Sequence, residues 1–314
     1  MPNISLDILI YLLGFGGLWF GSGLIVSSVG KLSHRIKISP FLLSFVVLGL
    51  LTSIPEIAVG ILSVNESTPQ VYVGNLLGGI PVLFLFVIPV LAIAGHGIKP
   101  NYKLGKESIL LSIIVSIAPF FAVIDGKVTN NEAIFLIGFY IFAVFILNAK
   151  NKVVTKKFDL SKIKKYSILD FIEIIVGAII VFVSSNIIVN KTLFFADFFH
   201  INPFYISIII LSFGTNLPEI SLAVRSILTG NKDIAFGDYL GSASANTLLF
   251  GIFTLLSKGQ TIFVGNFIVM TIIVIIGLIM LYKFARSKDQ ISSKEGIILI
   301  LIYIAFAVFE LSRK

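Results

Sequence analysis

The chain has 314 residues, of which 57% are hydrophobic and only 13% are charged, and its mean hydropathy is +1.03. Soluble globular proteins have about a quarter of their residues charged, so this composition excludes that class and indicates a polytopic membrane protein. The absence of cysteine excludes disulfides, thiolate catalysis and cysteine metal sites. The net charge of +8 is explained by basic loops between membrane helices, so we expect no nucleic-acid partner.

Ten stretches without Asp, Glu, Lys or Arg predict ten membrane-spanning helices and an all-α polytopic fold. Most are long enough to cross ~30 Å of hydrocarbon as a helix. The segment before the first stretch is acidic and lacks the basic residues of a signal peptide, so we expect the first helix to be retained. In chain order the stretches are 8–30, 38–55, 67–98, 108–124, 133–149, 174–190, 198–218, 239–257, 259–282 and 296–309.

Basic residues are distributed unevenly over the loops that connect these helices. Most of the 24 Lys and Arg residues fall in alternate loops, which we assign to the cytoplasmic side, so both termini are predicted to lie outside a cell membrane. The longest polar run is basic and lies midway along the chain. We therefore expect helices one to five in 1–149, a basic cytoplasmic linker in 150–167 and helices six to ten in 168–314.

The two predicted halves contain the same motif 163 residues apart. Thr52-Ser53-Ile54-Pro55-Glu56 in the first half corresponds to Thr215-Asn216-Leu217-Pro218-Glu219 in the second. The register holds without a gap over a long span, which favours duplication over chance similarity. Because each half has an odd number of spans, the second half would enter the membrane inverted. The same offset pairs Gly14 with Gly177, Ser22 with Ser185, Pro40 with Pro203, Gly74 with Gly237 and Gly78 with Gly241.

The chemistry of the motif points to a cation site. Proline inside a helix removes an amide donor, so Pro55 and Pro218 should each open their helix near the preceding turn and free carbonyl oxygens. Thr52, Ser53, Thr215 and Asn216 add neutral oxygens. Glu56 and Glu219 add charge, and no Lys or Arg lies in the same span to compensate a buried carboxylate. Two carboxylates with oxygen ligands suit Ca²⁺ better than zinc or copper, and Mg²⁺ rarely gives up its water for such a site.

The paired motifs resemble those of the cation/Ca²⁺ exchanger superfamily, and most of all the prokaryotic sodium/calcium exchangers. The resemblance rests on the T-S-x-P-E element and the later Gly-rich element, and it covers the whole ten-helix plan. It implies that helices two, three, seven and eight surround the ions, while the long helices one and six slide past them. It also implies that Ser242 and Asn246 of the second half face the ions.

The first half departs from the family pattern at the corresponding positions. Gly79 and Leu83 stand where a Ser and an Asn or Asp are usual, so that half lacks two side-chain oxygens. Asn216 replaces a usual Ser, as in some Ca²⁺/H⁺ exchangers. Asp238 replaces a usual Asn and corresponds to Asn75; a helix-capping or interfacial role is favoured for it over a third carboxylate in the site.

The predicted function is therefore a secondary antiporter that exchanges Ca²⁺ for Na⁺ by alternating access, and not an enzyme. The predicted cation ligands are Thr52, Ser53, Glu56, Thr215, Asn216, Glu219, Ser242 and Asn246. A Ca²⁺/H⁺ antiporter is the alternative, because two close carboxylates bind and release protons as a pair. A passive cation channel using the same residues is an alternative of another class. We expect the lipid bilayer as surroundings, Ca²⁺ and a monovalent counter-ion as cargo, no cofactor and no obligatory protein partner.

Overall fold

The computed structural model describes residues 4–33, 49–98, 106–150, 168–220, 223–224, 232–257, 267–286 and 290–312. This part of the chain is helical except for short turns and one isolated antiparallel bridge between Ile98 and Ile291, so the predicted all-α class is confirmed. In chain order its elements are α1 (Ile4–Ser33), α3 (Gly49–Thr52), α4 (Ile54–Asn65), α5 (Pro69–Pro81), η2 (Val82–Val87), α6 (Ile88–Ala94), α7 (Lys106–Ala122), α8 (Asn130–Lys150), α9 (Ile168–Phe198), α10 (Pro203–Ile206), η4 (Ser207–Leu211), α11 (Ser212–Thr215), α13 (Lys232–Leu256), α14 (Phe267–Arg286) and α15 (Ser293–Ser312).

Seven helical segments among the described residues are long and apolar enough to cross a membrane. Three further apolar helices are shorter. The predicted linker from 151 onward and most of the predicted stretch 38–55 lie outside the described residues. The seven segments are Ile4–Gly21, Pro69–Ala94, Asn130–Leu147, Ile172–Phe198, Gly237–Leu256, Phe267–Arg286 and Ser293–Ser312, and the shorter helices are Ile54–Asn65, Ser108–Ala122 and Pro203–Thr215.

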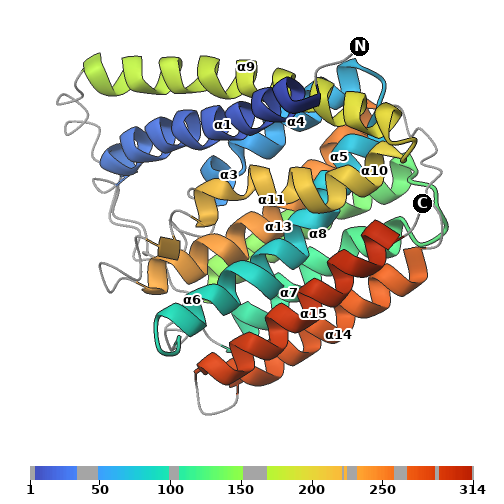
Figure 1. Cartoon of the computed structure of the whole chain (residues 1–314). Coiled ribbons are helices and arrows are strands. Elements are labelled where there is room, and N and C mark those ends of the chain that lie inside the picture. Colours follow the sequence, from blue (N-terminus) through green and yellow to red (C-terminus); the bar gives the residue numbers. More distant parts are fainter. Residues whose placement is uncertain are drawn as a thin grey trace.

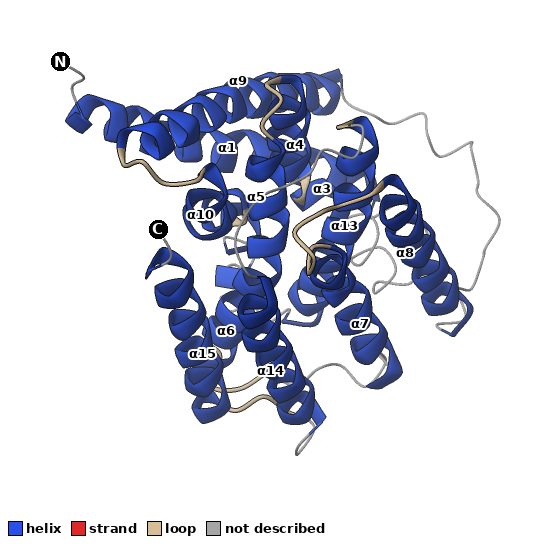
Figure 2. Ribbon diagram, turned by 90° about the vertical axis from the view of Figure 1, so that its right-hand side faces the viewer, coloured by secondary structure: helices blue, strands red, loops and turns tan. Residues whose placement is uncertain are grey.

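The elements form a central group with helices packed around it. Helices α5 and α13 lie in the middle, in contact with each other and with the short elements α3, η4 and α11. Helices α1 and α9 run side by side along one edge of the molecule, and α14 and α15 run together along the opposite edge (Figures 1 and 2). The outer helices expose many large apolar side chains, as expected for helices that face lipid. The central group is therefore the part shielded from lipid.

Small residues allow α1 and α9 to approach closely. A Cβ on Gly21 would lie 2.9 Å from the backbone oxygen of Gly177, and a Cβ on Gly17 would overlap the hydroxyl of Ser184. Close backbone approach through glycine is a common way for membrane helices to associate, because van der Waals packing replaces the hydrophobic driving force.

Polar contacts join the same two helices near both ends. Lys191 of α9 donates a 2.5 Å hydrogen bond to Asp7 of α1, and Ser28 near the other end of α1 donates to Glu173. The pair is thus held by packing in the middle and by polar groups at its ends.

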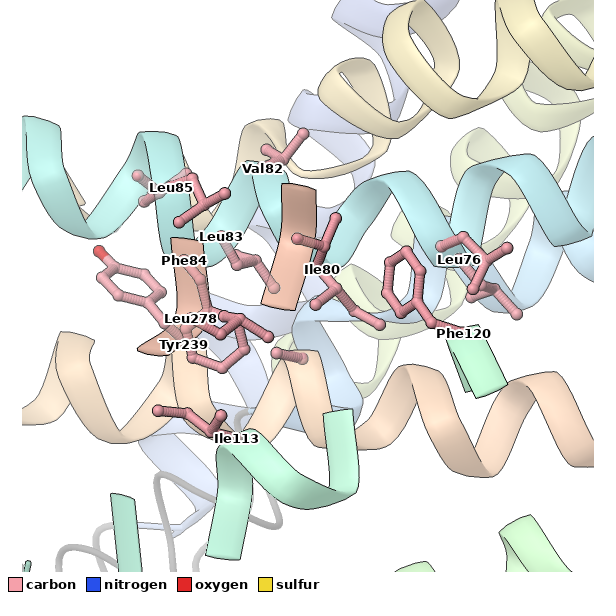
Figure 3. Packing of buried hydrophobic residues seen from close by; sticks show 14 of the residues in the cluster. Leu76, Ile80, Val82, Leu83, Phe84, Leu85, Ile113, Phe120, Tyr239 and Leu278 are labelled. Atoms are coloured by element: carbon pink, nitrogen blue, oxygen red, sulfur yellow. The ribbon is translucent and has the colours of Figure 1, made fainter. Parts of the chain in front are cut away.

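Apolar side chains fill the space between the central helices. Figure 3 shows Ile80, Leu83 and Phe84 in the layer between the α5–η2 segment and α13, together with Tyr239 and Leu278. All five are buried. Leu83, which stands where the family pattern has a polar ligand, is therefore part of the apolar packing.

Two helices begin with the same capping arrangement. The Glu132 carboxylate accepts hydrogen bonds from the backbone amide and hydroxyl of Thr129 before α8, and Glu295 does the same for Ser292 before α15. These are capping boxes, which satisfy amide groups that a helix start leaves without partners. Thr129 and Ser292 are 163 residues apart, so the offset of the sequence motif recurs in the local structure.

Candidate functional site

The two proline motifs interrupt their helices at equivalent residues. Ser53 is the turn residue between α3 and α4, and Asn216 is the turn residue that follows α11. The backbone amides of the two residues make equivalent hydrogen bonds: that of Ser53 donates to the Gly49 carbonyl and that of Asn216 to the Ser212 carbonyl, both at 3.3 Å. Because Pro55 and Pro218 have no amide hydrogen, neither can close the next helical hydrogen bond. The predicted openings are therefore confirmed, and each is confined to one residue.

The side chains at these turns are held in the same way. Ser53 Oγ donates to the Gly49 carbonyl, and Asn216 Nδ2 donates to the Ser212 carbonyl, both at 2.7 Å. Each turn residue thus gives a second hydrogen bond, from its side chain, to the carbonyl that already accepts its own backbone amide. This leaves the carboxamide oxygen of Asn216 without a donor.

The eight residues predicted as ligands are all buried, and α3–α4, α11 with the residues after it, and α13 bring them together. Ser242 of α13 donates a 2.9 Å hydrogen bond to Oε1 of Glu219, and its Oγ lies 3.2 Å from Oγ of Ser53. Glu56 and Glu219 are close enough to interact electrostatically. Residues from both halves of the chain therefore meet in a single polar centre.

Asp238 and Asn75 also belong to this centre, although neither was among the predicted ligands. Thr52 Oγ1 donates to Oδ1 of Asp238 at 3.3 Å, and Thr215 Oγ1 donates to Oδ1 of Asn75 at 3.0 Å. The two hydrogen bonds are counterparts at the offset of 163 residues. Asp238 lies inside α13 and is fully buried, so the expected capping or interfacial role was wrong. The offset between Asn75 and Asp238 was the sequence signal that could have placed them.

Unpartnered oxygen atoms are concentrated at this centre. In the described part of the chain, both carboxylate oxygens of Glu56 are buried without a hydrogen-bond partner, as are Oε2 of Glu219 and Oδ2 of Asp238. The carboxamide oxygens of Asn216 and Asn246 are in the same state. A buried acceptor without a donor costs free energy, and a cation is the partner that several such oxygens can share.

The ligand types limit which cation the centre can hold. No group of three or more His, Cys, Asp or Glu side chains lies within metal-binding reach anywhere in the described ranges. A cation here would therefore be held by carboxylates together with amide, hydroxyl and backbone oxygens. Such an all-oxygen set suits hard cations such as Ca²⁺ and Na⁺ and does not suit zinc or copper.

Helix α1 covers part of the centre. The ring of Phe15 occupies the space where a Cβ on Gly214 would lie, directly before Thr215. Phe15 is itself buried. Helix α1 thus contacts the interrupted helix at the residue next to the polar centre, and glycine at 214 is what admits the aromatic ring.

An all-helical membrane protein with a buried, oxygen-lined centre between interrupted helices belongs to the class of cation transporters. Comparison with protein families agrees with this class. The sodium/calcium exchanger protein family model matches residues 6–148 and 170–311, so the chain belongs to that family. The predicted membership of the cation/Ca²⁺ exchanger superfamily is confirmed, and the chain is a cation antiporter by family.

Individual relatives match three quarters or more of the chain. The sodium/calcium exchanger MaX1 of Methanosarcina acetivorans is 22% identical and covers 97% of this chain and 98% of its own. The inner membrane protein YrbG of Escherichia coli is 22% identical over 75% of each chain. A solved structure of the sodium-calcium exchanger NCX_Mj superimposes with a TM-score of 0.70 at 22% identity, covering 96% of this chain and 98% of that one. The structural likeness shows a shared fold.

Proposed function

We propose that this chain exchanges Ca²⁺ for Na⁺ across a cell membrane, using the centre around Glu56 and Glu219 as its ion site. The observation that carries the proposal is the set of six buried oxygens without donors on Glu56, Glu219, Asp238, Asn216 and Asn246. The other proposed ligands, Thr52, Ser53, Thr215 and Ser242, supply hydroxyl oxygens to the same centre.

The charge of the centre favours a divalent cargo. Glu56 and Glu219 together neutralise one divalent ion when both are ionised. The nearest polar contacts of the centre are hydroxyls and amides, and among the described residues neither carboxylate forms an ion pair with Lys or Arg. Ca²⁺ accepts about six to eight oxygen ligands in an adaptable geometry, whereas Mg²⁺ dehydrates reluctantly.

Alternating access follows from the repeated arrangement. We infer ten spans arranged as two inverted repeats, in 1–149 and 168–314, joined by a cytoplasmic linker in 150–167, with both termini outside. Counterpart hydrogen bonds from Thr52 and Thr215 support this, because an inverted pair would place equivalent contacts on opposite sides of one central site. The two access states would then use the same ligands.

Na⁺ is proposed as the counter-ion because the matching family model and the relative MaX1 are both named as sodium/calcium exchangers. The alternative is H⁺. It is favoured by the loss of side-chain oxygens at Gly79 and Leu83, since each additional Na⁺ needs neutral oxygens of its own. A centre with fewer neutral ligands would accommodate fewer monovalent cations.

The test is transport by the purified chain in liposomes under separately imposed Na⁺ and H⁺ gradients. ⁴⁵Ca²⁺ uptake should follow an outward Na⁺ gradient, and Glu56→Gln and Glu219→Gln should each abolish it. Glu66→Gln, an exposed glutamate at the end of α4, is the matched control and should transport as the parent does.

Three results would contradict the proposal in different ways. Uptake driven only by the H⁺ gradient would replace Na⁺ by H⁺ as the counter-ion. Uptake indifferent to either gradient, at rates far above those of antiporters, would identify a channel. Full transport by Glu56→Gln or Glu219→Gln would exclude this site.

A further inference from the structure

The two halves of the centre differ most at the position of Gly79. Its counterpart is Ser242, which donates to Glu219 and lies against Ser53. The first half has no hydroxyl at this position. Glu56, the counterpart of Glu219, accordingly has both carboxylate oxygens without a hydrogen-bond partner.

The space beside Gly79 is occupied by side chains of the second half. A Cβ at Gly79 would lie 2.7 Å from Nδ2 of Asn246 and 3.2 Å from Nδ2 of Asn216. Contacts below 3.0 Å require something to move, so any larger residue at 79 would displace the Asn246 carboxamide. Gly79 has ordinary helical backbone within α5, so no left-handed conformation requires glycine there. The requirement is space for the two carboxamides.

Both carboxamides are oriented by their nitrogen atoms. Asn216 Nδ2 donates to the Ser212 carbonyl at 2.7 Å, and Asn246 Nδ2 donates to the Leu76 carbonyl at 3.2 Å. Their oxygens are buried without donors. An amide whose nitrogen is held by backbone presents its oxygen in a fixed direction, and that oxygen can accept from a cation but cannot donate.

We propose that Gly79 is a specificity-determining residue: it admits the carboxamides of Asn216 and Asn246, whose oxygens replace the neutral ligands missing from the first half. This inference rests on the proposed function and assigns the amide ligands of the site to the second half of the chain. Fixed amide oxygens and a carboxylate with two open oxygens, all buried in the same polar centre, form a set suited to a divalent cation of the size of Ca²⁺.

The inference predicts coupling between position 79 and position 246. Gly79→Ala adds a single Cβ, which would press on the carboxamides of Asn246 and Asn216. Because overpacking a buried contact is costly, this change should weaken equilibrium ⁴⁵Ca²⁺ binding to the purified, full-length chain about tenfold. Asn246→Ser removes the closer carboxamide and should weaken binding by itself. Adding Gly79→Ala to Asn246→Ser should then change binding less than about threefold.

Controls separate the inference from the proposed function. Gly138→Ala, at an exposed position of α8 with open space around it, should bind Ca²⁺ as the parent does. Loss of ⁴⁵Ca²⁺ binding in Glu56→Gln supports the proposed site whatever Gly79→Ala does. If Glu56→Gln binds ⁴⁵Ca²⁺ as tightly as the parent does, the proposed site is overturned, and with it the ligand roles assigned to the two carboxamides.

With the site intact, two outcomes overturn the role of Gly79. One is unchanged binding by Gly79→Ala. The other is an equal loss from Gly79→Ala in the parent and in the Asn246→Ser background. If Gly79→Ala alone does not fold, the double variant Gly79→Ala/Asn246→Ser still tests the inference, because the smaller serine leaves space for the added Cβ. Ca²⁺ binding by the double variant close to that of Asn246→Ser supports the role of Gly79. Loss of folding in the double variant overturns that role.

Discussion

Ser242 donates a 2.9 Å hydrogen bond to Glu219, a contact that Glu56 lacks because its equivalent neighbour is Gly79. The two carboxylates of the centre occupy equivalent positions in the motif but have unequal surroundings. Glu219 accepts a hydrogen bond from the Ser242 hydroxyl, and Glu56 has no counterpart of that contact. The carboxylates therefore differ in how much they depend on a bound cation.

Removing the hydroxyl of Ser242 should destabilise the cation-free protein. A hydrogen bond to a buried charged group contributes about 1.5–3 kcal/mol, so Ser242→Ala should lower the free energy of unfolding by that order. Thermal unfolding in detergent without Ca²⁺ or Na⁺ measures this. Ser244→Ala is the matched control, since the Ser244 hydroxyl donates to the Leu240 carbonyl of its own helix, and its effect should be smaller. Equal losses in the two variants would contradict a special contact with Glu219.

Asp238→Asn should weaken Ca²⁺ binding more than Na⁺ binding. The change removes the negative charge that Asp238 carries when it is ionised beside a bound cation, and it keeps an oxygen that can accept from Thr52, as Asn75 accepts from Thr215. Electrostatic attraction scales with the charge of the ion, so the divalent cation loses more. We expect apparent Ca²⁺ affinity to fall about tenfold, measured by competition between ⁴⁵Ca²⁺ and Na⁺.

An exposed aspartate provides the control for that charge change. Asp197→Asn, near the end of α9, should leave both affinities unchanged. Equal changes in Ca²⁺ and Na⁺ affinity in Asp238→Asn would show that its carboxylate acts on the structure and not on the ion.

Gly21→Ala should separate α1 from α9. The added Cβ would lie 2.9 Å from the Gly177 backbone oxygen, and a backbone atom cannot rotate away as a side chain can. We expect a loss of about 1–3 kcal/mol in the free energy of unfolding, measured by thermal unfolding. Gly23→Ala makes the same change on an exposed position of the same helix with open space around it, and it should be neutral or slightly stabilising. An unchanged free energy of unfolding in Gly21→Ala would show that α1 and α9 tolerate a wider spacing.

Local chemistry explains what could be predicted about the fold. Apolar runs of sufficient length become membrane helices because the lipid interior leaves backbone groups no other partner, and this holds for any tertiary arrangement. Proline interrupts a helix by removing its own amide donor, so the turns at Ser53 and Asn216 were predictable from Pro55 and Pro218 alone. The oxygens of Glu56 and Glu219 could be assigned to one polar centre because the same motif occurs in both halves.

The sequence by itself therefore determined the membrane class, the positions of the helix interruptions and the two central glutamates, because these follow from composition, from the chemistry of proline and from the motif that both halves repeat. Only the tertiary structure decided that Asp238 lies in the centre beside Thr52, and that Asn246 and Asn216 occupy the space beside Gly79. These contacts join residues far apart in the chain. They depend on which faces of two helices meet and on the distance between those helices. The spacing of residues along a single helix specifies neither the faces nor the distance.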